Sequence, residues 1–193
     1  MRKPARPNPG PEVPHVLPLQ PGFPVRMRRF VVVFAICLLL GFGLVLAPFA
    51  QPVVTSFTEG LVEVSGRLIR FFGGRAVVTG NLLQSPANHF GIQMVNGCNA
   101  LNVTLLLWAA VLAFPASWSQ KAKGLLAGTA AIHAVNLVRF VSLFYIGQYN
   151  QAWFDFAHWY LWESVMMLDT LVVFWIWVHM VRRSGSMRDA SPQ

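Results

Sequence analysis

The sequence has few charged residues and only two cysteines. Asp, Glu, Lys and Arg together make up 11% of its 193 residues, whereas about 25% is usual for a soluble domain. Hydrophobic residues make up 55%, so lipid is the expected main solvent of the chain. Two cysteines are too few for a disulfide framework. Cys37 lies inside an apolar run and Cys98 outside one, so we expect both to remain unpaired.

Acidic residues are scarcer than basic ones, and the formal net charge is +8. The Lys and Arg residues gather beside apolar runs, namely at the N-terminus, around residues 121–123 and near the C-terminus. Basic groups in such places are topology signals of membrane proteins. No basic stripe interleaved with aromatic residues lies on an amphipathic face, so nucleic-acid binding is not expected. No internal repeat is visible either.

Four apolar runs predict transmembrane helices, at residues 30–50, 100–116, 124–147 and about 159–180. About 20 residues, at about 1.5 Å each, cross a bilayer core of about 30 Å. The first run could instead be a signal peptide. We favour an uncleaved anchor, because the run is longer than the usual apolar part of a signal and Pro48 suits no cleavage site. The predicted fold class is all-α, a polytopic membrane bundle of about four transmembrane helices with an amphipathic helix and a small extracytoplasmic loop region.

The region between the first two runs has a mixed pattern. Its apolar residues recur at alternating spacings of three and four, and they are Val54, Phe57, Leu61, Val64, Leu68 and Phe71. Glu63 and Arg67 lie one turn apart. This pattern predicts an amphipathic helix, on the membrane interface or against the bundle. Gly73-Gly74 is expected to end the helix, and residues 75–95 are expected to form short strands joined by turns.

The charge distribution also predicts the domain organisation and topology. Residues 1–25 are rich in proline and basic residues, and we expect a disordered cytoplasmic tail there. Residues 26–183 would form the integral membrane domain, and residues 184–193 a second cytoplasmic tail. The basic loop 117–123 would lie inside, whereas segments 51–97 and 148–158 would face outward.

Cys98 is the candidate nucleophile. It follows Gly97, lies between Asn96 and Asn99, and precedes the second apolar run. The N-terminus of a helix favours a thiolate, so we expect an acidic, outward-accessible thiol there. An inert, buried cysteine is the alternative.

Arg139 lies inside the third apolar run, about eight residues or about 12 Å below the outer end near Gly147 if the helix is regular. An arginine in a membrane span costs about 2.5–3.5 kcal/mol on insertion scales, so a partner or a reaction is expected to use it. Asn136 shares its helix face and could orient it. The alternative is a structural ion pair with Asp169 or Glu163.

His158 enters the fourth run from the outside, among several aromatic residues. It is either an interfacial histidine in an aromatic belt or a proton shuttle for Cys98. The order of the spans can bring Cys98, Arg139 and His158 to one depth near the outer face. The other histidines fall at different depths, so we expect no metal site; they are His89, His133 and His179.

Three short segments carry a resemblance to a known family. They are Val95-Asn-Gly-Cys98-Asn-Ala-Leu101, Asn136-Leu-Val-Arg139 and Phe156-Ala-His158. Together they resemble the exosortase/archaeosortase family over roughly residues 85–180, and the short chain is similar to a compact exosortase H-type member. Asn99-Ala100 stands where the family more often has Ser-Gly, and Trp162 stands where Gly is frequent.

The resemblance implies a membrane-embedded cysteine protease or transpeptidase of the bacterial cytoplasmic membrane, with both termini cytoplasmic and the active site facing outward. Cys98 would be the nucleophile, Arg139 would stabilise the oxyanion and His158 would transfer the proton, with Asn136 and Asn99 in support. The implied partners are membrane lipid and secreted proteins whose C-terminal sorting signal has a short motif, a hydrophobic helix and a basic tail. No cofactor is implied. The alternative is a non-catalytic assembly factor or a small transporter, although a transporter would more often show broken helices or repeated halves.

Overall fold

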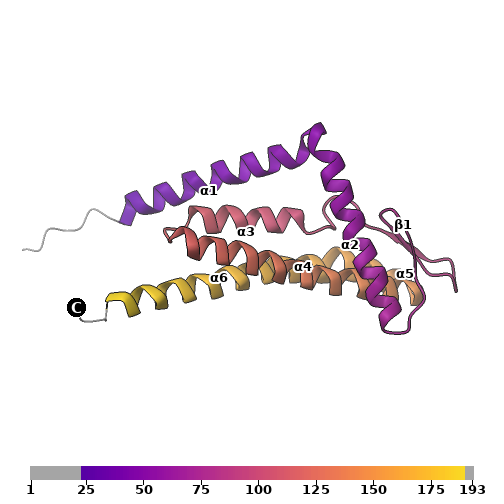
Figure 1. The fold of residues 1–193 in the computed structure, drawn as a ribbon. Coiled ribbons are helices and arrows are strands. Elements are labelled where there is room, and N and C mark those ends of the chain that lie inside the picture. Colours follow the sequence, from indigo (N-terminus) through magenta and orange to yellow (C-terminus); the bar gives the residue numbers. More distant parts are fainter. Residues whose placement is uncertain (1–22, 190–193) are drawn as a thin grey trace, which may run out of the picture.

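The computed structural model describes residues 23–189, which are mostly helical (Figure 1). Its elements in chain order are α1 (Phe23–Leu46), the 3₁₀ turn η1 (Pro48–Ala50), α2 (Gln51–Phe71), β1 (Val77–Thr79), β2 (Leu82–Gln84), β3 (Gly91–Gln93), α3 (Leu101–Ala113), α4 (Trp118–Tyr149), α5 (Gln151–Phe156), the π-helical turn η2 (Ala157–Leu161) and α6 (Trp162–Asp189). The expected tails lie outside the described residues over 1–22 and 190–193.

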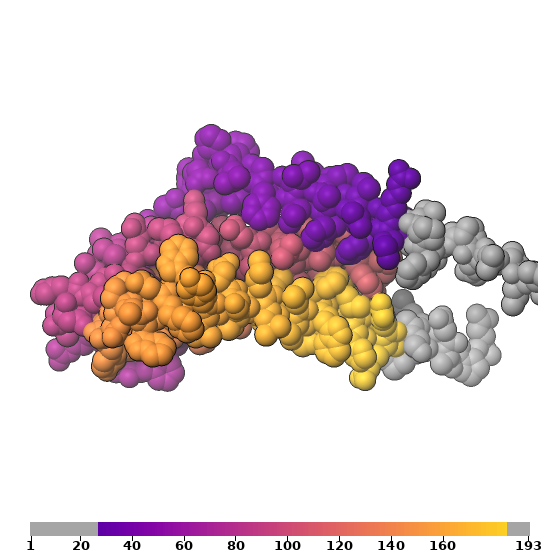
Figure 2. All heavy atoms as spheres, turned by 180° about the vertical axis from the view of Figure 1, so that it is seen from behind, coloured from indigo at the N-terminus to yellow at the C-terminus, as the bar shows by residue number. Residues whose placement is uncertain are grey.

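Helices α1, α3, α4 and α6 run along the length of the molecule (Figure 1). Viewed from behind, α1 forms one long edge and α6 the other (Figure 2). Among the described residues, three stretches are long and apolar enough to cross a membrane, and they are Met27–Leu46, Trp118–Tyr149 and Gln151–Ser184. The predicted all-α polytopic membrane bundle is therefore confirmed.

Helix α3 is shorter than the transmembrane helix predicted for residues 100–116. It has 13 residues, which span about 20 Å and fall short of a bilayer core of about 30 Å. Phe114 has extended backbone angles (φ −71°, ψ 138°), because Pro115 disfavours the α conformation at the residue before it. The sequence pattern missed this early end because the apolar run continues through the turn.

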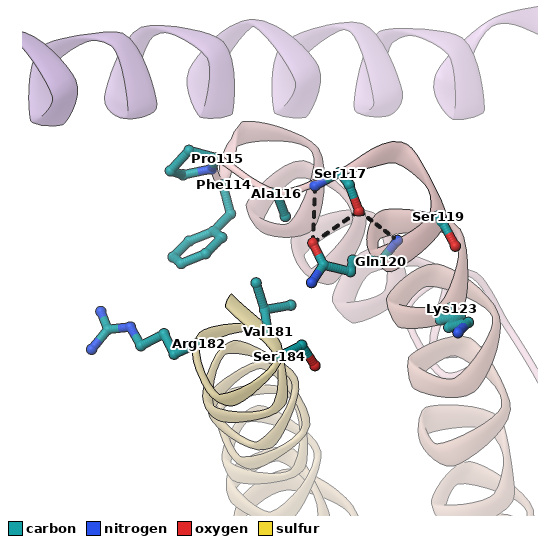
Figure 3. Close-up of a pocket in the computed structure, with 10 residues that line it drawn as sticks. All are labelled: Phe114, Pro115, Ala116, Ser117, Ser119, Gln120, Lys123, Val181, Arg182 and Ser184. Carbon is teal, nitrogen blue, oxygen red and sulfur yellow. Dashed lines mark hydrogen bonds between the residues drawn. The ribbon is translucent and has the colours of Figure 1, made fainter. Parts of the chain in front are cut away.

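Two segments predicted as polar loops are helical. Residues 118–123 form the start of α4, where Ser117 and Gln120 make a reciprocal capping box (Figure 3). Most of the predicted outer loop 148–158 belongs to α4, α5 and η2, and the Asn150 side chain accepts a hydrogen bond from Trp153 N–H. Such polar residues satisfy the free N–H groups at the start of a helix, so here they begin helices and do not form loops.

The amphipathic helix and the short strands are confirmed. Helix α2 runs across the direction of the other long helices, at the end of the molecule where the sheet lies (Figure 1). It ends at Gly73 (φ +81°), where the N–H groups of Gly73 and Gly74 donate to the carbonyls of Arg70 and Ile69. The three strands form an antiparallel sheet in the order β1-β2-β3. The fully buried Leu83 at its centre pairs with Val78 and Ile92.

The face that α2 buries differs from the predicted apolar face. The buried residues are Val54, Thr58, Val62, Ser65, Gly66 and Ile69, whereas Phe57, Val64 and Phe71 are exposed. A Cβ at Gly66 would meet Val78 Cγ2 at 2.5 Å, so small residues are needed where the helix meets the sheet. The close approach of the helix to the sheet, which requires small residues, therefore selects the buried face.

The buried apolar side chains form two clusters. One joins α2, the sheet and the C-terminal part of α4, and includes Ile69, Leu83, Met94, Phe140 and Phe144. The other joins α3, α4 and α6, and includes Leu107, Val111, Ile132, Met166 and Trp177. Arg139 directly precedes Phe140 in α4 and therefore lies where these two clusters meet.

Candidate active site

Cys98 lies in the connection between β3 and α3. Its N–H donates to Val95 O at 2.9 Å, and the preceding Gly97 (φ +98°) supplies the backbone conformation that the turn requires. The side chain is half-buried. Helix α3 begins only at Leu101, so Cys98 precedes the first helical turn and does not form part of it.

The two residues after Cys98 fix this connection. The Asn99 amide is buried, donates to Thr58 Oγ1 at 3.0 Å and accepts from Leu101 N–H at 3.2 Å. Ala100 has left-handed backbone angles (φ 59°, ψ 10°). Glycine adopts such positive φ angles without strain, whereas a residue with a Cβ does so at a cost. Thr58 itself was missed at the sequence level, because its position gave no sign of which α2 face is buried.

His158 approaches Cys98 from the other end of the chain. Its Nε2 lies 3.3 Å from Cys98 Sγ. The imidazole stacks on the Phe154 ring, with centroids 5.7 Å apart and planes 15° apart, and meets Trp159 edge-on. These rings fix the plane of the imidazole, so its nitrogen remains directed toward the thiol.

Arg139 completes the group from α4. It is 4% exposed, and its Nη2 lies 4.0 Å from Cys98 Sγ. The depth difference of about 12 Å expected from the sequence therefore does not keep the guanidinium away from the thiol. The three side chains singled out in the sequence therefore lie together, from three separate segments.

The region that contains these three residues matches a known protein family. Residues 26–176 match the family described as transmembrane exosortase (Exosortase_EpsH). The chain belongs to this family. No curated protein and no solved structure matches the chain. The matched range includes Cys98, Arg139 and His158.

In this exosortase, Arg139 also faces an acidic residue. Its Nη2 lies 4.0 Å from Glu163 Oε2, with side-chain exposures of 5% for the arginine and 58% for the glutamate. Of the two ion-pair partners considered from the sequence, Glu163 is therefore the one within reach. Within the described residues, Asp169 makes no such pair, and its Oδ2 is buried without a hydrogen-bond partner.

The expected support from Asn136 is not found. Asn136 is fully buried, but neither its amide nitrogen nor its amide oxygen has a hydrogen-bond partner among the described residues. It shares a helix face with Arg139 without binding it. Helix periodicity predicted the shared face correctly. It does not give the distance between the ends of the Asn136 and Arg139 side chains.

The Cys98 thiol differs from the acidic thiol expected from the sequence. Burial raises the pKa of Cys98 above its ordinary value, and the Arg139 guanidinium only partly offsets this effect. Two further reasons act in the same direction, since Cys98 lies outside the helical turn and Glu163 lies near the guanidinium. The thiol is therefore neutral near pH 7, and His158 Nε2 lies within hydrogen-bonding distance of it.

The remaining histidines lie elsewhere. His89 is exposed, His133 meets the Phe57 ring edge-on and His179 stacks on Trp175. Across residues 23–189, no group of three or more His, Cys, Asp or Glu side chains is placed to hold a metal ion.

Two hollows with polar lining residues lie in different parts of the molecule. A polar hollow of about 400 Å³ lies between α2 and the Cys98 connection, lined by Thr55, Thr58, Asn81, Met94, Val95 and Asn96. A larger one of about 910 Å³ lies between the start of α4 and the end of α6, at the opposite end of the bundle (Figure 3). The lining of the polar hollow reaches Asn96, two residues before Cys98.

Proposed function

We propose that this exosortase is a cysteine-dependent membrane peptidase or transpeptidase that cleaves secreted proteins at a C-terminal sorting signal. The contact between Cys98 Sγ and His158 Nε2, 3.3 Å long and beside Arg139, carries the proposal. Acyl transfer needs a nucleophile, a base and a fixed cation that lie close together, as these three side chains do.

The first half-reaction begins with the neutral thiol. With the imidazole proton on Nδ1, the Cys98 S–H donates to His158 Nε2, which takes the proton as sulfur attacks the scissile carbonyl carbon. The carbonyl π electrons move to oxygen, and the Arg139 guanidinium stabilises the resulting oxyanion in a site with little water.

The second half-reaction returns the proton. Collapse of the tetrahedral intermediate breaks the C–N bond, and His158 donates its proton to the leaving amine. The acyl group remains on Cys98 as a thioester. An acceptor, either water or a nucleophile such as an amine, then attacks the thioester, gives its proton to His158 and releases the thiolate, which His158 reprotonates.

The substrate would be a secreted protein whose signal consists of a short motif, a hydrophobic helix and a basic tail. The substrate helix would pack beside the spans of the enzyme. The polar hollow of about 400 Å³ beside the Cys98 connection is a suitable place for the residues around the scissile bond, because Thr55, Asn81 and Asn96 offer hydrogen-bonding groups there.

We also propose the orientation. The basic residues Arg28, Arg29, Lys121, Lys123, Arg182 and Arg183 lie at the ends of the helices opposite the sheet. By the positive-inside rule this end faces the cytoplasm, so both termini would be cytoplasmic and Cys98 would face outward from the inner membrane.

Processing of a tagged protein with a C-terminal sorting signal tests the proposal. Cys98→Ala should lose processing by about 10⁴-fold or more, and Arg139→Lys by about 10²-fold because lysine lacks the planar fork. Cys37→Ala, which removes the other cysteine, and His179→Ala, which removes a distant histidine, should process normally. Normal processing by the Cys98→Ala protein would end the enzymatic proposal.

The Arg139–Glu163 approach also supports a second function, that of a non-catalytic assembly factor or small transporter with a structural arginine. Under that function, Cys98→Ala would keep full biological activity, whereas Arg139→Lys would lower the amount of folded protein. Membrane abundance and substrate processing, measured on the same variants, separate the two functions.

A further inference from the structure

The helix between His158 and Glu163 contains one turn that is wider than an α-helical turn. In η2, the N–H of Trp162 donates to the carbonyl of Ala157, five residues back. A π turn of this kind is one extra residue inserted into an α-helix, and such turns are frequent at functional sites. Here the extra residue falls between His158 and Glu163.

The wide turn changes the direction of Glu163 relative to His158. At about 100° per residue, residues five apart in an α-helix point about 140° away from each other. When one inserted residue is absorbed, five residues turn about as far as four do in an α-helix, and the two side chains diverge by only about 40°. His158 and Glu163 therefore point in similar directions, His158 toward Cys98 and Glu163 toward Arg139 on α4.

On α4, Arg139 lies near both Glu163 and the thiol that His158 contacts. Arg139 Nη2 is 4.0 Å from Cys98 Sγ and 4.0 Å from Glu163 Oε2. The guanidinium is buried while the carboxylate remains half in solvent. A buried cation next to a neutral thiol needs a counter-charge, and Glu163 is the only acidic residue within ion-pair distance of it among the described residues.

We propose that Glu163 is a positioning residue for Arg139 and the fourth member of the centre formed by Cys98, Arg139 and His158. This inference rests on the proposed function. The carboxylate holds the guanidinium between sulfur and oxygen, so that it can bind the oxyanion when the intermediate forms. Without the carboxylate, the guanidinium would pair with a Cys98 thiolate, which stabilises the ground state and not the transition state.

Among the described residues, no other acidic side chain lies within ion-pair distance of Arg139. Asp155 accepts a hydrogen bond from Gln151 at 3.0 Å. On α2, Glu63 is bound by Arg67 and Arg70, and Glu59 lies beside Gly80 in the turn between β1 and β2. The charged side chains that act on the Cys98 thiol are therefore Arg139 and Glu163, whereas Asp155 acts on His158.

The test measures two properties of the full-length membrane protein in a Cys37→Ala background, where Cys98 is the only thiol. In Glu163→Gln, alkylation of Cys98 by iodoacetamide should reach its midpoint at lower pH, because the guanidinium then acts on sulfur unopposed. Processing should nevertheless fall about tenfold, because the guanidinium is no longer held for the oxyanion. Glu163→Asp keeps the charge with a shorter reach and should give intermediate values. Glu59→Gln is the matched control and should change neither property.

Each outcome of this test either supports or overturns the role of Glu163. An unchanged alkylation profile in Glu163→Gln, or a shifted profile with full processing, overturns the role of Glu163. If Glu163→Gln fails to accumulate, Glu163→Asp carries the test, and wild-type values in that variant overturn the role. Failure of the proposed function would instead show as normal processing by Cys98→Ala. That result does not depend on the alkylation profile of Cys98, so the two failures are distinguishable.

Discussion

Cys98 Sγ and His158 Nε2 lie 3.3 Å apart, although 60 residues separate them in the chain. The contact joins the short connection before α3 to the π-helical turn before α6, and Arg139 reaches it from α4. Since burial raises the pKa of the thiol, the proposed reaction would start from a neutral thiol beside a base and not from a preformed ion pair.

The first prediction concerns the pH dependence of the thiol. An ordinary cysteine with a pKa near 8.5 is about 3% thiolate at pH 7, and Cys98 should be less ionised because burial raises its pKa. In the Cys37→Ala protein, the iodoacetamide reaction of Cys98 should therefore rise with pH through a midpoint above that of a free cysteine. A midpoint below pH 8 would contradict the burial argument.

The second prediction concerns the base. His158→Gln should lower processing by about 10²–10⁴-fold and leave the amount of folded protein nearly unchanged, because the residue is only half-buried. His179→Gln removes a histidine that stacks on Trp175 and is the matched control. If His158→Gln processes the substrate as well as His179→Gln does, another group is the base.

The third prediction concerns the anchor of the Cys98 connection. Thr58→Ala leaves the buried Asn99 amide without its partner, which costs about 1–3 kcal/mol. Asn99→Ala should cost a similar amount, since it also frees Leu101 N–H. Thermal unfolding in detergent checks both single variants and the double variant. Additive losses would show that the two side chains do not stabilise each other.

The fourth prediction compares two glycines of α2. A Cβ at Gly66 would meet Val78 Cγ2 at 2.5 Å, whereas one at Gly60 would meet nothing within 4 Å. Gly66→Ala should therefore destabilise the protein by about 1–3 kcal/mol through overpacking against the sheet. Gly60→Ala should be neutral or up to about 1 kcal/mol more stable. Equal melting temperatures would argue against close packing of α2 on the sheet.

The fifth prediction concerns Ala100, whose φ of 59° is unusual for a residue with a Cβ. Ala100→Gly should relieve about 1–2 kcal/mol of left-handed strain and lose up to about 1 kcal/mol to the greater freedom of the unfolded chain. The melting temperature should stay level or rise slightly. Ala100→Val should lower it clearly, because a β-branched side chain tolerates this conformation poorly.

Much of the architecture follows from local patterns. Apolar runs predicted the membrane class, and a spacing of three and four residues predicted α2. Arg139 stood out because a charge within an apolar run is costly. These features depend on residues close together in the chain, where helix periodicity and hydropathy act directly.

The segment ends were harder to predict. Ser117 and Asn150 look like loop residues in the sequence and cap helices in the structure. The same side-chain chemistry serves turns and helix starts, and neighbouring contacts decide between the two.

The sequence by itself determined that this is a helical membrane protein of the exosortase type and that Cys98, Arg139 and His158 are its unusual polar residues. Only the tertiary structure decided that they touch, that Glu163 faces the same guanidinium and that Asn136 does not bind it. The physical reason is that these contacts depend on the length of α3, the extra residue in η2 and the packing of α4 against α6. Each of these changes the position or the direction of a side chain, and none produces a periodic pattern in the sequence.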